Sequence, residues 1–345
     1  MTKTAMTRMT IRSAQTLMLV IAAMLMVCAS DTFAARKSTS QTNKGRISYT
    51  KNGRIHVSIP GQPDGEPIIK CREGHHDFKP SWSKKGWLVF FRRVKNDPDT
   101  LKWKTDLYIA GYNGKGLRKL ADGDTANFNP TWTRDGSHMP IWSRKDKAHK
   151  WTTYNIMTTT INGSPGTEYP LTASRYHSWA YSCLKDGRIL VNSTHDGPLQ
   201  YYLMTPGDNK KNPNPTFELI KCDLASKGFL ARITLTPDEK KVCFEFSPHS
   251  NKSKDTGRIL YHGKFDKTKR VMYDLVPFAN HKPTLDYAWF AYPRWLEGSN
   301  RIAFHANSTG KGRLFIYDLK TKETKQISTD ETADYRYPHG EMMPK

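Results

Sequence analysis

Several short segments of this sequence gather side chains that bind anions or transfer protons. They are residues 75–79, 127–129, 175–179, 286–290 and 334–337, and most are rich in His, Tyr, Arg or Trp. Arginine pairs with a carboxylate or sulfate through two parallel hydrogen bonds, and histidine and tyrosine can move protons. Aromatic rings can also cover the face of a sugar. These residue types predict a binding site for an acidic sugar or a similar anion.

Nine residues from these segments are the predicted ligand contacts. They are Arg175, Tyr176, His177, Trp179, His75, His76, Tyr287, Arg336 and Tyr337. In a catalytic version of the site, β-elimination from a uronic acid needs a cation at the carboxylate, a base for the C5 proton and an acid for the leaving oxygen. The candidates are Arg175 or Arg336 as the cation, His177 or His76 as the base, and Tyr176 or Tyr337 as the acid. The alternative to a functional role is a structural one, in which His75 and His76 cap a turn and Tyr176 is a packing residue.

A repeated phrase leads into the strands that must position these side chains. Three copies read Pro-x-Trp, at Trp82, Trp132 and Trp295, and two degenerate copies lie around Cys183 and Leu235. The copies recur at intervals of about 50 residues, and each begins a series of four short apolar strands with tight turns. Four antiparallel strands in about 45–50 residues make one blade of a β-propeller. The sequence therefore predicts five complete blades.

The two ends of the repeat region supply a sixth blade. Residues 45–50, 54–58 and 67–70 read as three strands without a Pro-x-Trp strand before them, and residues 334–342 resemble the segment around Pro293. We expect the C-terminal strand to be the innermost strand of the first blade, which closes the ring and removes a free sheet edge. The predicted fold class is all-β, a six-bladed β-propeller over residues 45–345. A β-sandwich is the alternative.

The first 34 residues are typical of a secretory signal peptide. Lys3, Arg8 and Arg12 precede an apolar run over residues 17–27, and cleavage is predicted after Ala34 or Ser30. A retained membrane anchor is the alternative, although the run is shorter than the roughly 18–20 residues that span a bilayer. Residues 35–44 are polar and predicted to form a disordered leader. We expect a periplasmic or secreted bacterial monomer with no transmembrane span after processing.

The formal net charge of +22 favours polyanionic partners and predicts salt-dependent binding. Nucleic acid is the usual partner of such a chain, but export argues against it. Acidic polysaccharides, lipopolysaccharide, teichoic polymers and anionic lipids remain as partners, and a basic surface that only favours solubility is the alternative. No phosphate loop, nucleophile elbow or His-Glu-x-x-His motif is present. We expect no cofactor and no metal, although His195, His249 and His305 occupy matching positions in the later repeats.

The signal peptide and the Pro-x-Trp-[Ser/Thr]-x-Asp-Gly turns give the chain a resemblance to the TolB-like propellers of the bacterial envelope. The resemblance covers residues 45–342 and implies the fold rather than a function, because its signature residues are turn and core elements. TolB itself carries an α/β domain before its propeller, where this chain has only the short leader. The related oligogalacturonate lyases have a histidine cluster before an inner strand, and the matching residues 77–80, 127–130 and 335–338 contain none.

The predicted function is non-catalytic. We expect a binding or scaffold module that presents a basic, aromatic face to an anionic envelope or glycan partner. The first alternative is a polysaccharide lyase or hydrolase that acts on uronic-acid polymers at the same face. The second is a Tol-type partner of outer-membrane lipoproteins.

Overall fold

The computed structural model describes residues 46–58, 64–94, 105–123, 126–145, 154–172, 176–207, 213–249, 258–279, 289–296, 298–307 and 311–340. They belong to one compact unit, residues 43–345. The predicted signal peptide (1–34) and leader (35–44) lie outside the described residues. Within the described part, every regular element is a β-strand. No helix there is long and apolar enough to cross a bilayer.

The first three blades follow the chain from its N-terminal side. Blade 1 contains β1 (Ile47–Lys51), β2 (Arg54–Ser58) and, as its inner strand, β23 (Tyr335–His339). Blade 2 contains β3 (His75–Trp82), β4 (Trp87–Val94), β5 (Asp106–Gly111) and β6 (Arg118–Ala121). Blade 3 contains β7 (Asn127–Trp132), β8 (Pro140–Lys145), β9 (Tyr154–Thr158) and β10 (Tyr169–Pro170). Each sheet is antiparallel, as tight hairpins require.

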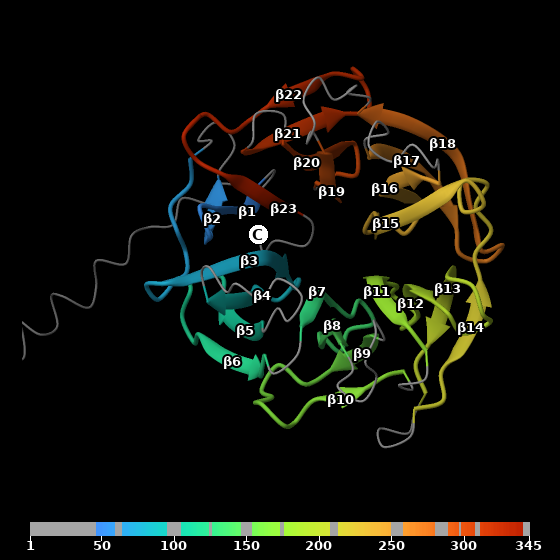
Figure 1. Ribbon diagram of the computed structural model, residues 1–345, viewed down its shortest axis with the longest axis horizontal. Helices are drawn as coiled ribbons and strands as arrows, with labels where there is room; N and C mark the ends of the chain where they lie inside the picture. The colour runs from blue at the N-terminus through green and yellow to red at the C-terminus, as the bar shows by residue number, and fades with distance from the viewer. Residues whose placement is uncertain are drawn as a thin grey trace, which may run out of the picture. The chain divides into compact units, whose positions relative to one another are not determined.

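The other three blades repeat the same four-strand order. Blade 4 contains β11 (Ser178–Cys183), β12 (Ile189–Ser193), β13 (Gln200–Thr205) and β14 (Thr216–Leu219). Blade 5 contains β15 (Gly228–Leu235), β16 (Lys241–Pro248), β17 (Ile259–Asp266) and β18 (Val271–Ala279). Blade 6 contains β19 (Trp289–Trp295), β20 (Arg301–Asn307), β21 (Gly312–Asp318) and β22 (Thr324–Gln326). Figure 1 shows the six sheets arranged around a common centre.

The C-terminal strand closes the ring as the sequence predicts. β23 pairs antiparallel with β1, with Ser48 opposite His339 and Lys51 opposite Tyr335. The inner strands contact one another in the cyclic order β23, β3, β7, β11, β15, β19 and back to β23. The outer part of blade 1 is shorter than predicted, because a single bridge between His56 and Pro67 replaces the strand expected over residues 67–70.

The tryptophans of the repeat join neighbouring blades. Trp82 in blade 2 donates its indole N–H to Ser48 Oγ in blade 1 at 2.9 Å. Trp132 in blade 3 donates to the Ser81 carbonyl in blade 2 at 2.9 Å, and Trp295 in blade 6 donates to the Thr234 carbonyl in blade 5 at 3.3 Å. All three rings are fully buried. The Pro-x-Trp repeat is therefore a packing element, which agrees with the structural role implied by its position.

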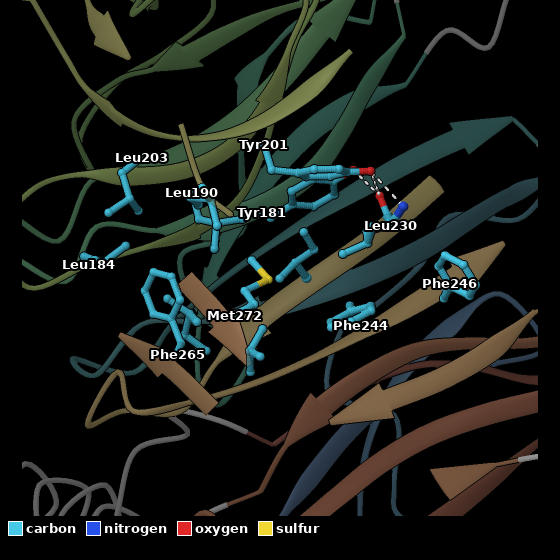
Figure 2. Close-up of a cluster of buried hydrophobic side chains, with 14 residues drawn as sticks. Tyr181, Leu184, Leu190, Tyr201, Leu203, Leu230, Phe244, Phe246, Phe265 and Met272 are labelled. Atoms are coloured by element: carbon cyan, nitrogen blue, oxygen red, sulfur yellow. Dashed lines mark hydrogen bonds between the residues drawn. The ribbon is translucent and has the colours of Figure 1, made fainter. Parts of the chain in front are cut away.

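Apolar side chains fill the spaces between adjacent sheets. Figure 2 shows one such cluster, formed mainly by blades 4 and 5, in which Leu190 and Leu203 pack with Phe244 and residues around it. Tyr201 accepts the Leu230 N–H at 2.7 Å and donates to the Leu230 carbonyl at 2.9 Å. A buried phenol is costly without such partners. These two bonds fix the inner strand β15 against blade 4. They thereby also position the residues that follow Leu230 in that strand.

Candidate functional site

A bulge at the same place in the inner strands turns one residue of each toward the centre. The five residues there with left-handed backbone, all with φ between 50° and 57°, are Lys79, Asn129, Arg232, Tyr292 and Tyr337. The pairing register with the next strand shifts at each of them. This conformation costs a non-glycine residue roughly 1–2 kcal/mol, and bulges commonly re-aim side chains beside active sites. Because this conformation recurs in five inner strands, these five residues are candidates for a functional site.

The re-aimed side chains surround a cavity of about 490 Å³, which we call the channel cavity. All six blades contribute to its lining. Its cationic side chains are Lys79, Arg232, Arg258 and Arg336, and no carboxylate is among the described residues that line it. Aromatic groups, including Phe128 and Trp179, cover much of the remaining wall. The cavity therefore combines excess positive charge with apolar ring faces.

Lys79 lies in a cage of three aromatic rings. Its Nζ is 5.3 Å from the ring centroid of Phe128, 5.2 Å from that of Tyr292 and 5.8 Å from that of Tyr337. The side chain also donates a long hydrogen bond of 3.4 Å to Asn129 Oδ1. No carboxylate among the described residues forms an ion pair with it, and burial lowers the pKa of its ammonium group. Ring faces attract the ammonium charge but do not neutralise it.

Glu245 on β16 fixes the arginines of the cavity from behind. The carboxylate is 1% exposed, pairs with Arg232, and lies 3.1 Å from the Arg258 guanidinium. Its other oxygen accepts the Tyr292 N–H at 2.7 Å. One buried carboxylate therefore holds two guanidinium groups and the bulge of β19 in place, while leaving a net positive charge toward the cavity.

Tyr292 is the titratable group at the centre of this arrangement. The Arg232 guanidinium carbon is 4.2 Å from its ring centroid. Burial by itself raises the pKa of a phenol, but the charges of Arg232 and Lys79 outweigh it and lower the pKa of Tyr292 to about 8. The ring of Tyr337 meets it edge-on at 4.6 Å, and burial raises the pKa of Tyr337 to about 12. The pKa values of the two adjacent phenols are therefore displaced in opposite directions.

His305 packs against both phenols. Its ring centroid is 5.4 Å from that of Tyr292 and 5.5 Å from that of Tyr337, and its Nδ1 accepts the Tyr337 N–H at 3.3 Å. Burial lowers the pKa of His305 well below its usual range, so the ring is neutral near pH 7. A neutral acceptor at this place supports the bulge of β23 without adding charge to the cavity.

A second cavity, of about 510 Å³, lies at the seam between blades 1 and 2, and we call it the seam cavity. Its lining includes Thr50, His76 and Arg93, and it shares Arg336 and Tyr337 with the channel cavity. The turn at Gly53 is part of its wall. A Cβ atom there would stand 2.4 Å from the His76 ring, and the φ of +76° is in the left-handed region. Only glycine allows this approach of the two blades.

The structure brings only part of the predicted contact set together. His177, Trp179, Arg336 and Tyr337 line the channel cavity, and His76 lines the seam cavity. His75 and Tyr176 line neither of the two cavities. Arg175 and Tyr287 lie outside the described residues.

Three of the predicted segments are parts of inner strands and do not precede them. β3 begins at His75, β7 at Asn127 and β23 at Tyr335, so the histidine pair, residues 127–129 and Arg336 belong to the strands themselves. In blade 4, Tyr176 packs on His195 at 4.9 Å between ring centroids, and His195 stacks on Phe217 of the outer strand β14 at 4.3 Å. No group of His, Cys, Asp or Glu in the described ranges is suited to hold a metal.

The prediction from sequence missed three residues that dominate the cavity: Lys79, Arg232 and Tyr292. A usable signal is present for two of them. Lys79 and Tyr292, like Asn129 and Tyr337, directly precede the proline of the repeat. Because that position is equivalent in four strands, alignment on the proline alone would have brought these side chains to one level of the ring.

Comparison with known proteins supports the fold class that these observations define, a six-bladed β-propeller. No protein-family model and no curated protein matches the chain. TolB from Acinetobacter baumannii is similar in structure, with a TM-score of 0.61 at 13% identity over 87% of this chain and 67% of that chain. At this identity the likeness shows the fold alone, and the fold of this protein is TolB-like.

Other solved structures share the fold but differ in what their names describe. Hydrazine synthase from Kuenenia stuttgartiensis gives a TM-score of 0.60 at 13% identity over 85% of this chain and 46% of that chain. An oligogalacturonate lyase in complex with manganese gives 0.51 at 10% identity over 79% and 74%. Because one fold carries such different proteins, the function must be argued from the site.

Proposed function

We propose that the protein is an exported binding module whose channel cavity holds an anionic group of an envelope or glycan partner. The observation that carries the proposal is the lining of this cavity, in which four cationic side chains and no carboxylate are found among the described residues. A site shielded from bulk water strengthens hydrogen bonds from arginine to an anion. Glu245 already holds Arg232 and Arg258 in position, so ordering these side chains on ligand binding would cost little free energy.

The apolar part of the cavity favours an acidic sugar over a simple ion. Phe128 and Trp179 lie next to the cationic side chains, with their ring centroids 5.3 Å apart in a stacked arrangement. A uronic acid carries both a carboxylate for the arginines and a ring face for the aromatic wall. The predicted signal peptide supports a periplasmic or secreted location, and we propose that the protein acts there as a monomer.

Removing two cavity arginines is expected to weaken binding of galacturonic acid oligomers. Each charge-assisted hydrogen bond contributes about 1.5–3 kcal/mol, so the double variant Arg258→Ala/Arg336→Ala should bind at least about tenfold more weakly. Calorimetric titration at low and moderate salt measures this, with neutral glucose oligomers of equal length as the ligand control. The matched charge control is Lys320→Ala/Lys325→Ala, two exposed lysines of blade 6. Equal loss in both double variants would reject the channel cavity as the site.

The affinity for the same oligomers is expected to fall as the pH rises through about 8. Below that pH Tyr292 is neutral, and above it the phenolate places a negative charge among the cations that bind the ligand. In Tyr292→Phe this fall should be absent. An ultraviolet titration of the folded protein locates the ionisation independently, because phenolate absorbs where phenol does not. Wild-type affinity that stays constant from pH 7 to pH 9 would contradict this reading of Tyr292.

One observation favours the catalytic alternative, a uronic-acid lyase at the same cavity. Tyr292 and Tyr337 have pKa values displaced in opposite directions, as a base and an acid acting in sequence need. Ionised Tyr292 would take the C5 proton, the C4–O bond would break as the C4–C5 double bond forms, and Tyr337 would protonate the leaving oxygen. His177 lines the same cavity and remains a candidate base. Unsaturated products absorb in the ultraviolet, so incubation with polygalacturonate without any rise in absorbance leaves binding alone.

A further inference from the structure

We infer that the ligand site continues from the channel cavity into the seam cavity, and that it is built for an acid with at least two anionic groups along an oligomer. The inference rests on the proposed function and adds the size and charge pattern of the ligand. Two neighbouring residues of β23 make the connection, since Arg336 and Tyr337 border both cavities. A ligand bound at the channel arginines and extended past Arg336 enters the seam.

Arg336 is suited to serve both sides. Its guanidinium group is paired with Asp334 at 2.8 Å, and both side chains are about one-third exposed, at 35% and 34%. A guanidinium has five N–H donors in a planar fork. The pair with Asp334 uses only part of them, so the same group can donate to an anion at the boundary between the cavities.

The seam cavity has a second guanidinium group besides that of Arg336. Arg93 lines the cavity, and its guanidinium carbon is 5.4 Å from the ring centroid of Phe78. Both lining carboxylates are already engaged by arginines, Asp77 with Arg92 at 2.7 Å and Asp334 with Arg336 at 2.8 Å. Each carboxylate of the lining is therefore already held by a guanidinium group, which reduces its repulsion of an anion placed beside Arg93.

The seam cavity also contains a polar group, the Thr50 hydroxyl, whose surroundings are fixed by backbone hydrogen bonds. Thr50 is 5% exposed, and its Oγ1 has no hydrogen-bond partner among the described residues. The backbone around it is held by the Asp77 N–H donating to the Gly53 carbonyl at 2.8 Å and the Asn52 N–H donating to the Asp334 carbonyl at 3.0 Å. A buried hydroxyl without a partner is unusual. A sugar hydroxyl next to a carboxylate bound at Arg93 would supply that partner.

The test compares galacturonic acid as monomer, dimer and tetramer by calorimetric titration at low salt. In the wild type the tetramer should bind more than about tenfold tighter than the monomer, beyond the fourfold statistical advantage of four units, because Arg93 adds a charge-assisted contact. In Arg93→Gln the ratio of tetramer to monomer affinity should fall toward that statistical value. Arg54→Gln, which removes an exposed arginine of β2 that lines neither cavity, should keep the wild-type ratio.

Three results would overturn the inference, and they separate it from the proposed function. A wild-type ratio near the statistical value rejects the extension into the seam but leaves anion binding in the channel intact. A high ratio that persists in Arg93→Gln, with circular dichroism showing an intact fold, rejects the role of Arg93 and with it the second anionic contact. Absence of binding at every length rejects the proposed function as well.

Discussion

A chain that ends before Asp334 is expected not to form the closed propeller. The deletion removes β23, whose Tyr335 is fully buried and whose register with β1 places Lys51 opposite Tyr335 and Ser48 opposite His339. β1 is then left with an unpaired edge, which is a site for aggregation. Domains are stable by only about 5–15 kcal/mol, so the loss of an entire inner strand should remove most of that margin. Chemical denaturation followed by circular dichroism measures it.

A circular permutant separates closure from simple loss of residues. Because His339 lies opposite Ser48, a short loop can join residue 340 to residue 46, with new ends between β6 and β7. The permutant keeps every blade whole and makes β23 and β1 a hairpin. It should fold with a stability near that of the full chain. A truncated chain that unfolds with the same free energy as the full chain would show that β23 does not close the ring.

Removing the Glu245 carboxylate is expected to give the second largest effect. Glu245→Ala leaves the guanidinium groups of Arg232 and Arg258 without their shared buried carboxylate and removes the acceptor of the Tyr292 N–H. Breaking one side of a buried ion pair costs about 3–5 kcal/mol. Denaturant titration should therefore show a decrease of that size in the free energy of unfolding. Glu245→Gln keeps an acceptor for Tyr292 and should lose less.

Glu218 provides a matched control for this prediction. It also lies between two arginines, Arg188 at 2.9 Å and Arg270 at 2.7 Å, but its side chain is 35% exposed. Surface ion pairs contribute about 0–1 kcal/mol, so Glu218→Ala should have a small effect. Equal losses for the two variants would mean that Glu245 is not the buried anchor of the channel. In a double variant Glu245→Gln/Arg232→Gln, part of the lost stability should return, because one uncompensated charge is removed.

The fold could be predicted from the sequence because each blade carries its own packing information. Pro130 and Trp132 recur in equivalent places in other blades, and the indole N–H of Trp132 bonds to the blade before it. The closure of the ring could also be predicted, because residues 334–342 resemble another inner strand and the first blade lacks one. The sequence did not indicate where the inner strands begin. His75 and His76 are polar, yet they continue β3 because its first residues still pair with β4.

The candidate site could be predicted only in part because the channel residues owe their direction to bulges. The bulge positions hold Lys, Asn, Arg, Tyr and Tyr, so no single residue type marks them. The role of Glu245 also cannot be predicted from a single repeat, because this residue of blade 5 accepts the N–H of Tyr292 in blade 6. Predictions built on composition named four residues that line the channel cavity, His177, Trp179, Arg336 and Tyr337. They chose Tyr176, which packs on His195, and passed over Arg232.

The most direct test of the account is a crystal structure of the protein with digalacturonate bound. We predict density for one sugar in the channel cavity, with its carboxylate within hydrogen-bond distance of Arg258 or Arg336 and its ring beside Trp179. The second carboxylate should lie in the seam cavity near Arg93. A saturated crystal in which the sugar occupies the outer faces of the blades and leaves both cavities filled with water would contradict the central claim.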